Sequence, residues 1–363
     1  MKAFIAVSAT ALDKGGALTI LIQFLKYASQ DTENHYVCFV SKGLDLGQYD
    51  NISLIEVDKM GWFKRIAWDA YYFKSEISKI QGEVVKAISL QNTSLNVTCE
   101  QVVYLHQSLP FTDVRLSLLK REQFKLCLYK YFYVFFINLF VDDETKFFVQ
   151  TNWMRKSLHK KCNIKNSNIY VVRPDIALSV PECNDSSTSK TGVHKLIYPA
   201  TPLFYKNHIV ILKALQILKL NKGLGATLFQ VTFDHGDCPK FDRYVNDFCL
   251  SANVEYLGII PHSELLRKYM ESTLVLFPSF IETFGLPLAE GAAFKKPILC
   301  SDLPYSREVL SGYPGASFIK YDEAQDWADG ISKSLLDFES NSLNSNLWSF
   351  SYKTSWEDFF KLI

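Results

Sequence analysis

The chain has 363 residues, 48% of them hydrophobic, and a formal net charge of +1. A chain of this size can bury a large core and is long enough for two domains. The near-neutral charge gives no global bias toward nucleic acid, and we expect no nucleic-acid partner. The eight cysteines lie far apart without a C-x-x-C spacing, which predicts neither a zinc site nor a disulfide framework and fits a reducing, cytoplasmic location.

The amino-terminal half begins with an apolar run and a glycine loop. The run, residues 2–8, is too short for a signal peptide and predicts a strand. A helical pattern follows Gly15 and Gly16. Because glycine has no Cβ, this loop could approach a phosphate or a sugar closely; the alternative is a tight turn only. Further strands are expected at residues 36–40, 53–57, 84–90 and 101–105, and an aromatic-rich helical pattern at 61–80. His106 follows the last of these strands.

Residues 116–140 are mostly apolar and include several basic residues. The longest part without a charge, residues 131–141, is far shorter than the ~20 residues that a membrane-spanning helix needs. One interpretation is a long helix buried in the amino-terminal domain. The other is a surface that lies on an anionic membrane leaflet, with Lys120, Arg121 and Lys125 near the lipid phosphates. Both can hold for different sides of one helix.

A change in composition divides the chain. Residues 181–192 are almost entirely polar, which predicts a linker or an exposed loop. From residue 194 to 319, strand and helix patterns alternate, which is typical of parallel βαβ units in a doubly wound sheet. We expect domains at 1–175 and 194–345, a linker at 176–193, and a carboxyl-terminal helix within 346–363 that packs on the first domain. The two domains should face each other across a cleft, with ligands at the carboxyl ends of the strands.

The segment from Phe277 to Glu290 is the most informative stretch. It predicts a strand, a tight loop and a helix with Pro287 at its first position. Such a loop presents free backbone N–H groups and a helix dipole to an anionic ligand. It also holds two carboxylates, Glu282 in the loop and Glu290 in the helix, eight positions apart. Asp142 and Asp143 do not form a D-x-D metal motif and predict only a surface turn.

The residues around the two glutamates resemble the E-x7-E signature of family 4 of the retaining glycosyltransferases, which have the GT-B fold. The resemblance continues through residues 297–302 and 308–309. It also includes Gly258, residues 205–207, and, more thinly in the first half, Gly15, Gly16, His106 and residues 150–151. It implies two Rossmann-like α/β domains, the first binding the acceptor and the second the nucleotide sugar.

The resemblance also implies a role for each candidate catalytic residue. Lys206 would stabilise the diphosphate leaving group where its negative charge grows, without a metal or another cofactor. Glu282 would hold hydroxyl groups of the donor sugar. His106 would touch that sugar near the reacting carbon.

The donor site implied by the resemblance is larger than these three residues. Glu290 would accept hydrogen bonds from the ribose hydroxyls. Backbone groups of the glycine loop and of the helix start would surround the diphosphate. The full set of donor-binding candidates is Gly15, Gly16, Lys206, Gly258, Glu282, Thr283, Phe284, Gly285, Leu286 and Glu290.

One departure from the family pattern concerns Thr201. The family commonly has an arginine there, so one phosphate-binding cation is missing, a loss of ~2–3 kcal/mol if nothing compensates. The expected activity is transfer of a hexose, with retention by a front-face mechanism, from a UDP-, GDP- or dTDP-sugar to a saccharide acceptor. The expected acceptor is a polyprenyl-diphosphate-linked O-antigen, capsule or exopolysaccharide intermediate at the inner face of the cytoplasmic membrane. The alternatives are a sugar-nucleotide epimerase or hydrolase of similar fold and a non-catalytic glycosyltransferase subunit.

Overall fold

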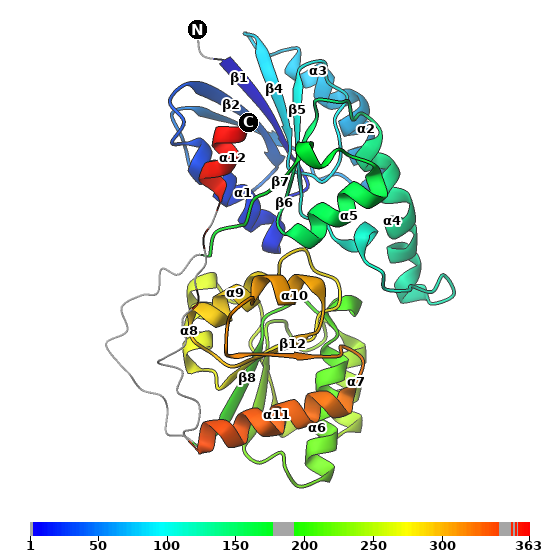
Figure 1. Cartoon of the computed structure of the whole chain (residues 1–363), viewed down its shortest axis with the longest axis vertical. Helices are drawn as coiled ribbons and strands as arrows, with labels where there is room; N and C mark the ends of the chain where they lie inside the picture. Colours follow the sequence, from blue (N-terminus) through cyan, green and yellow to red (C-terminus); the bar gives the residue numbers. More distant parts are fainter. Residues whose placement is uncertain (1–2, 177–191, 341–349, 351–352, 354) are drawn as a thin grey trace. The chain divides into compact units, whose positions relative to one another are not determined.

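The computed structural model describes residues 3–176, 192–340, 350, 353 and 355–363 (Figure 1). The chain forms two compact units: unit 1 is Met1–Asp175 with Lys353–Ile363, and unit 2 is Ile176–Tyr352. The units divide at the boundary expected after residue 175. Most of the expected linker, residues 177–191, lies outside the described residues. The expected cleft between the domains stays a prediction, and each unit is described by itself.

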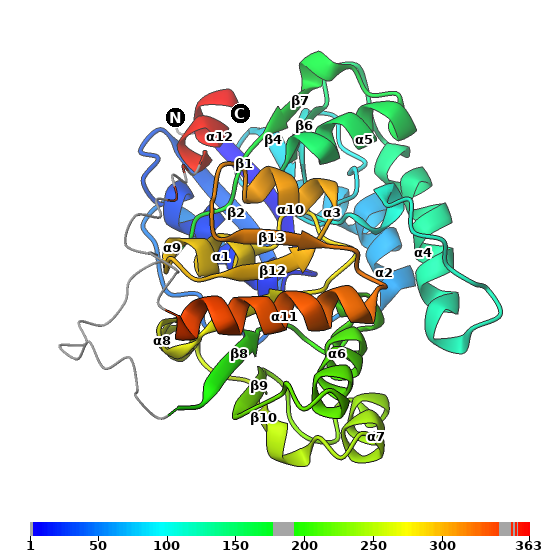
Figure 2. The ribbon, with the colours of Figure 1, turned by 60° about the horizontal axis from the view of Figure 1, so that its bottom comes forward.

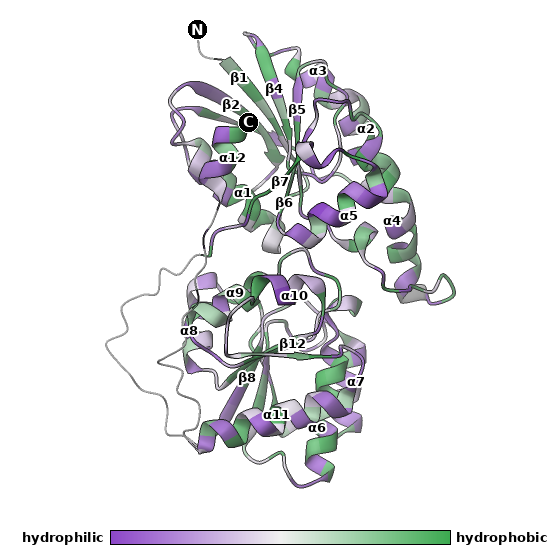
Figure 3. Ribbon diagram, in the orientation of Figure 1, coloured by the Kyte–Doolittle hydropathy of each residue, from purple (hydrophilic) through white to green (hydrophobic). Residues whose placement is uncertain are grey.

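Unit 1 contains a seven-stranded sheet in the order β3-β2-β1-β4-β5-β6-β7. Its strands are β1 (Ala3–Ala9), β2 (Asn34–Ser41), β3 (Ile52–Val57), β4 (Val84–Ser89), β5 (Glu100–Leu105), β6 (Lys146–Val149) and β7 (Ile169–Val171). All neighbouring strands are parallel, so their carboxyl ends share one edge. The central strands are buried on both faces, which explains their continuous apolar runs (Figure 3).

Helices cover both faces of this sheet. One hydrophobic core includes side chains of α1 (Gly15–Ala28) and α12 (Trp356–Leu362). Two other cores lie on the opposite sheet face. They include side chains of the π-helical turn η1 (Trp68–Tyr72), α3 (Phe73–Ile77), η2 (Leu109–Phe111), α4 (Arg121–Asn138) and α5 (Asn152–Cys162). Two further segments, α2 (Trp62–Ala67) and η3 (Asn166–Asn168), bury none of their residues. The helical pattern at 61–80 is therefore three short segments, with a π turn in the middle.

The carboxyl-terminal helix α12 completes the core of unit 1. Trp356 is fully buried and stacks on Tyr104 of β5, with ring centroids 5.2 Å apart. Its indole Nε1 donates a hydrogen bond of 2.8 Å to Gln23 Oε1 of α1. Phe359, also fully buried, packs edge-on against Phe148 of β6. The last residues of the chain therefore belong to the unit formed by its first 175.

Unit 2 contains a six-stranded parallel sheet in the order β10-β9-β8-β11-β12-β13. Its strands are β8 (His194–Tyr198), β9 (Thr227–Val231), β10 (Val254–Tyr256), β11 (Leu274–Phe277), β12 (Ile298–Ser301) and β13 (Ala316–Ile319). Its helical segments are η4 (Phe204–Lys206), α6 (His208–Leu220), α7 (Pro239–Asp247), η5 (Ser251–Asn253), α8 (His262–Glu271), α9 (Leu286–Ala293), α10 (Pro304–Val309) and α11 (Ala324–Glu339). α6 packs against α11, and α8 against α9 (Figure 2). Both units are thus α/β, with wholly parallel sheets, as predicted.

Two expectations about membranes and cysteines can be compared with the structure. None of the described helices is both long enough and apolar enough to cross a bilayer. The seven cysteines in the described part of the chain are free. Three of them, Cys38, Cys127 and Cys300, are buried. These three therefore pack as small apolar side chains.

Candidate active site

The candidate residues of unit 2 lie where parallel strands end. The turn η4 follows β8, Gly258 follows β10, and Glu282 lies in the loop after β11. Since β8 and β11 are neighbours in the sheet, the turn and the loop lie side by side. The carboxyl edge of a parallel sheet is the usual place for a ligand in an open α/β fold.

Lys206 and Glu282 form an ion pair across these two segments. The Lys206 ammonium donates a short hydrogen bond to Glu282 Oε1. Their side chains are only 18% and 14% exposed, so each charge is compensated mainly by the other. The sequence predicted separate contacts of these residues with the phosphates and the sugar. In the structure, they bind each other.

The backbone around Lys206 is held by several hydrogen bonds. The hydroxyl of Tyr198 donates to the Lys206 carbonyl at 2.8 Å. The backbone N–H of Phe280 donates to the Tyr205 carbonyl at 3.0 Å. Asn207, in the left-handed region with φ = 60°, donates through its side chain to the Tyr321 carbonyl at 2.6 Å. Neither Tyr198 nor Asn207 was predicted from the sequence to position Lys206. For Asn207, an asparagine directly before a predicted helix could have indicated this role, because asparagine is enriched in the left-handed region.

Helix α9 begins immediately after a glycine that no other residue could easily replace. Gly285 has φ = +84°, and a Cβ added there would lie 3.2 Å from a ring carbon of Phe277. The helix begins at Leu286, so Pro287 is its second residue rather than its first. Phe284, beside the glycine, is buried. The backbone N–H groups in the first turn of α9 therefore lie directly after a closely packed glycine turn.

Glu290 is buried in α9 and accepts two hydrogen bonds from α8. Tyr269 donates its hydroxyl to Oε2 at 3.0 Å, and His262 Nε2 lies 2.9 Å from Oε1. The hydrogen bond to Glu290 raises the pKa of His262 above its usual value, and the nearby carboxylate adds to this effect. Burial and Glu290 also raise the pKa of Tyr269 well above its usual value. Glu290, which was expected to bind the ribose, is therefore oriented by His262 and Tyr269. Neither partner was predicted from the sequence.

The remaining donor-binding candidates of unit 2 lie close to this edge. Gly258 has φ = +66°, and a Cβ added there would lie 2.8 Å from Asp234 Oδ1. Only glycine therefore allows the loop after β10 to approach the loop after β9. Thr283 and Leu286 are half-buried beside the glycine turn. The exposed Thr201 precedes η4, as expected from its place in the sequence.

The candidates of unit 1 lie at the carboxyl edge of its own sheet. Gly15 and Gly16 are exposed at the start of α1, and Gly15 has φ = +57°. His106 follows β5, and its Nε2 lies 2.9 Å from the Leu90 carbonyl, to which it donates. Its backbone N–H donates to Asn92 Oδ1 at 2.5 Å. Burial lowers the pKa of His106, so the imidazole is neutral near pH 7. In the sheet, β4 lies between β1, which precedes the glycine loop, and β5, which precedes His106.

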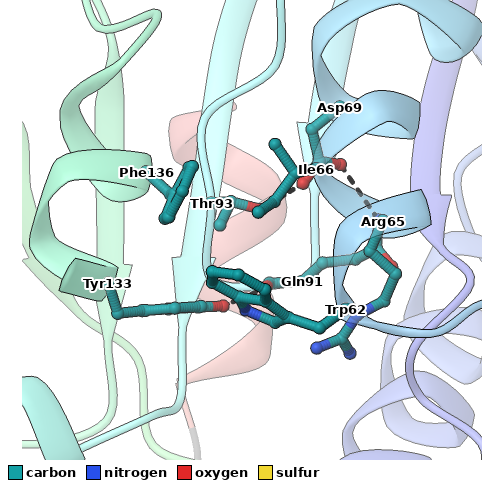
Figure 4. A pocket seen from close by; sticks show the side chains of 8 residues that line it. All are labelled: Trp62, Arg65, Ile66, Asp69, Gln91, Thr93, Tyr133 and Phe136. Carbon is teal, nitrogen blue, oxygen red and sulfur yellow. Dashed lines mark hydrogen bonds between the residues drawn. The ribbon is translucent and has the colours of Figure 1, made fainter. Parts of the chain in front are cut away.

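A pocket in unit 1 was not anticipated from the sequence. Figure 4 shows its walls, which are aromatic and polar side chains of α2, η1, α4 and the segment after β4. They are Trp62, Arg65, Ile66, Asp69, Gln91, Thr93, Tyr133 and Phe136. The hollow measures about 280 Å³ with its open mouth, and its inner part has room for about one water molecule. A sugar would therefore bind at the mouth or displace α2, which buries none of its residues.

The floor of this pocket is a buried polar network. Thr93 donates its hydroxyl to Asp69 Oδ2 at 2.7 Å, and Gln91 Nε2 lies 3.3 Å from Asp69 Oδ1. The hydroxyl of Tyr133 donates to the Gln91 carbonyl at 3.1 Å. Burial raises the pKa of Asp69 to about 7, although its hydrogen bond with Thr93 acts in the opposite direction. Carboxyl, amide, hydroxyl and aromatic groups together suit a polyhydroxylated ligand.

Within the described ranges, no three His, Cys, Asp or Glu side chains gather in a way that could hold a metal ion. Asp142 instead closes a turn, where its Oδ1 accepts hydrogen bonds from the backbone and the hydroxyl of Thr145. Asp143 pairs with Lys165.

Comparison with known proteins relates unit 2 to one family. Residues 181–344 match the family model of glycosyl transferases group 1. A stretch of 92 residues is 32% identical to the O-antigen chain mannosyltransferase RfbU of Salmonella typhimurium, covering 25% of this chain and 26% of that protein. The chain matches about a quarter or less of the length of the curated relatives.

Solved structures resemble nearly the whole chain. WaaG, a glycosyltransferase involved in lipopolysaccharide biosynthesis, has a TM-score of 0.69 at 14% identity, with 92% of this chain and 91% of that chain covered. Alr3699/HepE from Anabaena, solved with UDP and glucose, has a TM-score of 0.67 at 13% identity, with 94% and 92% covered. At these identities the likeness shows the fold, which is GT-B as expected.

Proposed function

Because residues 181–344 match the group 1 glycosyl transferases and the chain has the GT-B fold, we propose that it is a glycosyltransferase. It transfers a hexose from a nucleotide-sugar donor to a saccharide acceptor. The donor binds at the carboxyl edge of the unit 2 sheet, and the acceptor binds unit 1. The name of the relative RfbU supports mannose as the hexose and an O-antigen chain as the product.

The observation that carries this proposal is the Lys206–Glu282 ion pair beside the start of α9. A diphosphate that binds there would take Lys206 as its counter-ion, because the diphosphate of a nucleotide sugar carries two negative charges and the Glu282 carboxylate carries one. Glu282, released from the lysine, would accept hydrogen bonds from hydroxyl groups of the sugar. Donor binding would thus replace the ion pair between Lys206 and Glu282 with contacts of Lys206 to the diphosphate and of Glu282 to the sugar.

Leaving-group stabilisation would come from fixed groups of the chain. Lys206 is held in place by Tyr198 and the turn, so little reorganisation would be needed when charge develops on the diphosphate. The first N–H groups of α9 would add positive potential on the same side. We infer a reaction that requires no metal and retains the anomeric configuration, with the departing phosphate helping to deprotonate the acceptor. His106, neutral and anchored to Leu90, would contact the donor sugar.

The acceptor is proposed to meet the pocket between α2 and α4. Its indole and phenyl walls, Trp62 and Phe136, suit the apolar faces of sugar rings, and Asp69 and Gln91 suit their hydroxyls. We propose a polyprenyl-diphosphate-linked acceptor and a cytoplasmic enzyme at the inner face of the membrane. The name of RfbU, an O-antigen chain mannosyltransferase, supports this choice of acceptor class.

The test combines donor binding with product analysis. The full chain is mixed with UDP-, GDP- and dTDP-hexoses, and the donor that raises the melting temperature is then used for transfer. A specific donor at a hundredfold excess over its Kd should stabilise the protein by ~2.7 kcal/mol. NMR of the product should show the anomeric configuration of the donor. No stabilisation by any nucleotide sugar would refute the proposal, and an inverted product would refute the retaining mechanism.

A non-catalytic subunit is the competing function, and the absence of a cation at Thr201 is the feature that favours it. Such a protein could still bind a nucleotide sugar. Substitution Glu282→Gln separates the two: transfer should fall at least a hundredfold if the chain is the catalyst. Glu271→Gln is the matched control, because it breaks the Lys195–Glu271 pair on other elements of the same unit. Absence of transfer by the unmodified chain, despite donor binding, would favour the non-catalytic function.

A further inference from the structure

Helix α4 is apolar on two opposite sides. Tyr133 and Ile137 are buried against the sheet and α5, and Cys127 is buried on the same side of the helix. The opposite side carries large hydrophobic side chains that are each 39–64% exposed. They are Phe124, Leu128, Tyr131, Phe132, Phe135 and Leu139. A surface helix normally has polar residues on this side, so the exposed apolar stripe needs an explanation beyond folding.

The stripe continues onto neighbouring segments. Edge-on ring contacts of 5.0–5.4 Å connect Phe63 to Trp62 of α2, Trp62 to Phe136 of α4, and Phe136 to Phe135. Phe63 at one end is 79% exposed and Phe135 at the other is 60% exposed. Leu119, in the loop before α4, is 97% exposed. Figure 3 shows many hydrophobic residues along α4. We call Phe63, Leu119 and the six residues of the stripe the apolar surface.

Basic residues accompany the apolar surface. Residues 111–140 include five lysines and arginines but only two acidic residues. Of the five, Arg115, Lys120 and Lys125 are exposed. Lys64, next to Phe63, is exposed as well. The region therefore combines aromatic and leucine side chains with an excess of positive charge.

We propose that the apolar surface lies on an anionic phospholipid bilayer. Its aromatic and leucine side chains would enter the boundary between headgroups and acyl chains, and Arg115, Lys120 and Lys125 would lie near the lipid phosphates. A protein partner is less favoured, because charged residues are depleted where such interfaces bury their apolar centre. The described helices include none that spans a membrane, so the contact is peripheral. The proposal does not depend on a transfer activity, since vesicle binding needs no sugar.

Flotation with vesicles tests this proposal on the full chain. Vesicles of phosphatidylethanolamine with phosphatidylglycerol provide the anionic surface, and phosphatidylcholine vesicles provide the neutral one. The double variant Phe132→Ser, Phe135→Ser should bind the anionic vesicles at least tenfold more weakly than the unmodified chain. Leu220→Ser with Leu336→Ser is the matched control, because these exposed leucines lie in unit 2, and it should bind within twofold of the unmodified chain. If the phenylalanine variant does not fold, Leu119→Ser in the loop serves instead.

Substitution of exposed lysines tests how much their charge contributes to vesicle binding. Lys120→Gln with Lys125→Gln should weaken binding to anionic vesicles several-fold, and Lys213→Gln with Lys333→Gln, both exposed in unit 2, should not. Failure of the unmodified chain to float with anionic vesicles would overturn the proposal. So would equal binding to neutral vesicles, or a dimer in lipid-free solution that dissociates in the phenylalanine variant. Unchanged donor binding in the phenylalanine variant would show that membrane binding and donor binding depend on different parts of the protein.

Discussion

Lys206 and Glu282 lie 76 residues apart in the chain and form an ion pair at the carboxyl edge of the unit 2 sheet. The lysine belongs to the turn after β8, and the glutamate to the loop after the neighbouring β11. Each residue has the other as its counter-ion. Any anionic ligand at this edge must therefore compete with Glu282 for the lysine.

The first prediction concerns this pair. Lys206→Met or Glu282→Gln alone should lower the free energy of unfolding of unit 2 by ~1–3 kcal/mol, because each leaves a partner charge with little water. The double variant should recover most of that stability but no transfer activity. Urea unfolding and transfer assays measure the two effects. Lys195→Met with Glu271→Gln, which removes another ion pair of unit 2, should retain activity. Equal loss in both double variants would contradict the role of Lys206 and Glu282.

The second prediction concerns His262 and pH. Its pKa is raised above 6.5 by Glu290, so the folded state holds its proton more tightly than the unfolded chain does. The resulting stabilisation is complete below about pH 6.5 and is lost as the pH rises through the folded pKa. The melting temperature of the unmodified chain should exceed that of His262→Gln by more at pH 5.5 than at pH 8.5. A difference that grows with pH would contradict the hydrogen bond between His262 and Glu290.

The third prediction concerns Asp69, whose pKa is raised from 3.8 to about 7 by burial. Between these values the folded protein keeps a proton that the unfolded chain has lost, so this contribution to stability falls as the pH rises toward 7. Asp69→Asn cannot titrate and should therefore gain stability relative to the unmodified chain from pH 4.5 to 7.5. Denaturant unfolding at three pH values measures this gain. A stability difference between the two proteins that stays constant with pH would contradict the raised pKa of Asp69.

The fourth prediction concerns Trp356. Replacement by alanine leaves a cavity against Tyr104 and removes the hydrogen bond of the indole to Gln23, and should destabilise unit 1 by ~3–5 kcal/mol. Limited proteolysis should then cut unit 1 faster than unit 2. Leu362→Ala, at a 38% exposed position of the same helix, should change the cleavage rate little. Unchanged resistance in Trp356→Ala would contradict the assignment of α12 to the core of unit 1.

Much of the fold could be predicted because strands buried on both faces leave a clear local pattern. The segment from β11 to α9 shows this, since continuous buried apolar residues, a glycine turn and helix formers follow one another directly in the chain. The helix at residues 61–80 was predicted less well. Its π turn at Trp68–Tyr72 depends on how Trp68 and Phe73 pack against Phe39, a contact between distant segments. Local spacing carries no information about such a contact.

The sequence alone determined the α/β class, the parallel sheets, the two-part organisation and the positions of Glu282 in the loop and Glu290 in the helix on either side of a glycine turn. These features follow from hydrophobic periodicity and backbone conformation, which are local properties. Tertiary structure alone decided that Lys206 binds Glu282, that His262 and Tyr269 hold Glu290, and that a pocket opens beside Asp69. It also decided that α4 leaves Phe132 and Phe135 exposed while burying Tyr133. Each of these depends on which segments the sheet order brings together, and contacts across a sheet have no fixed spacing in the chain.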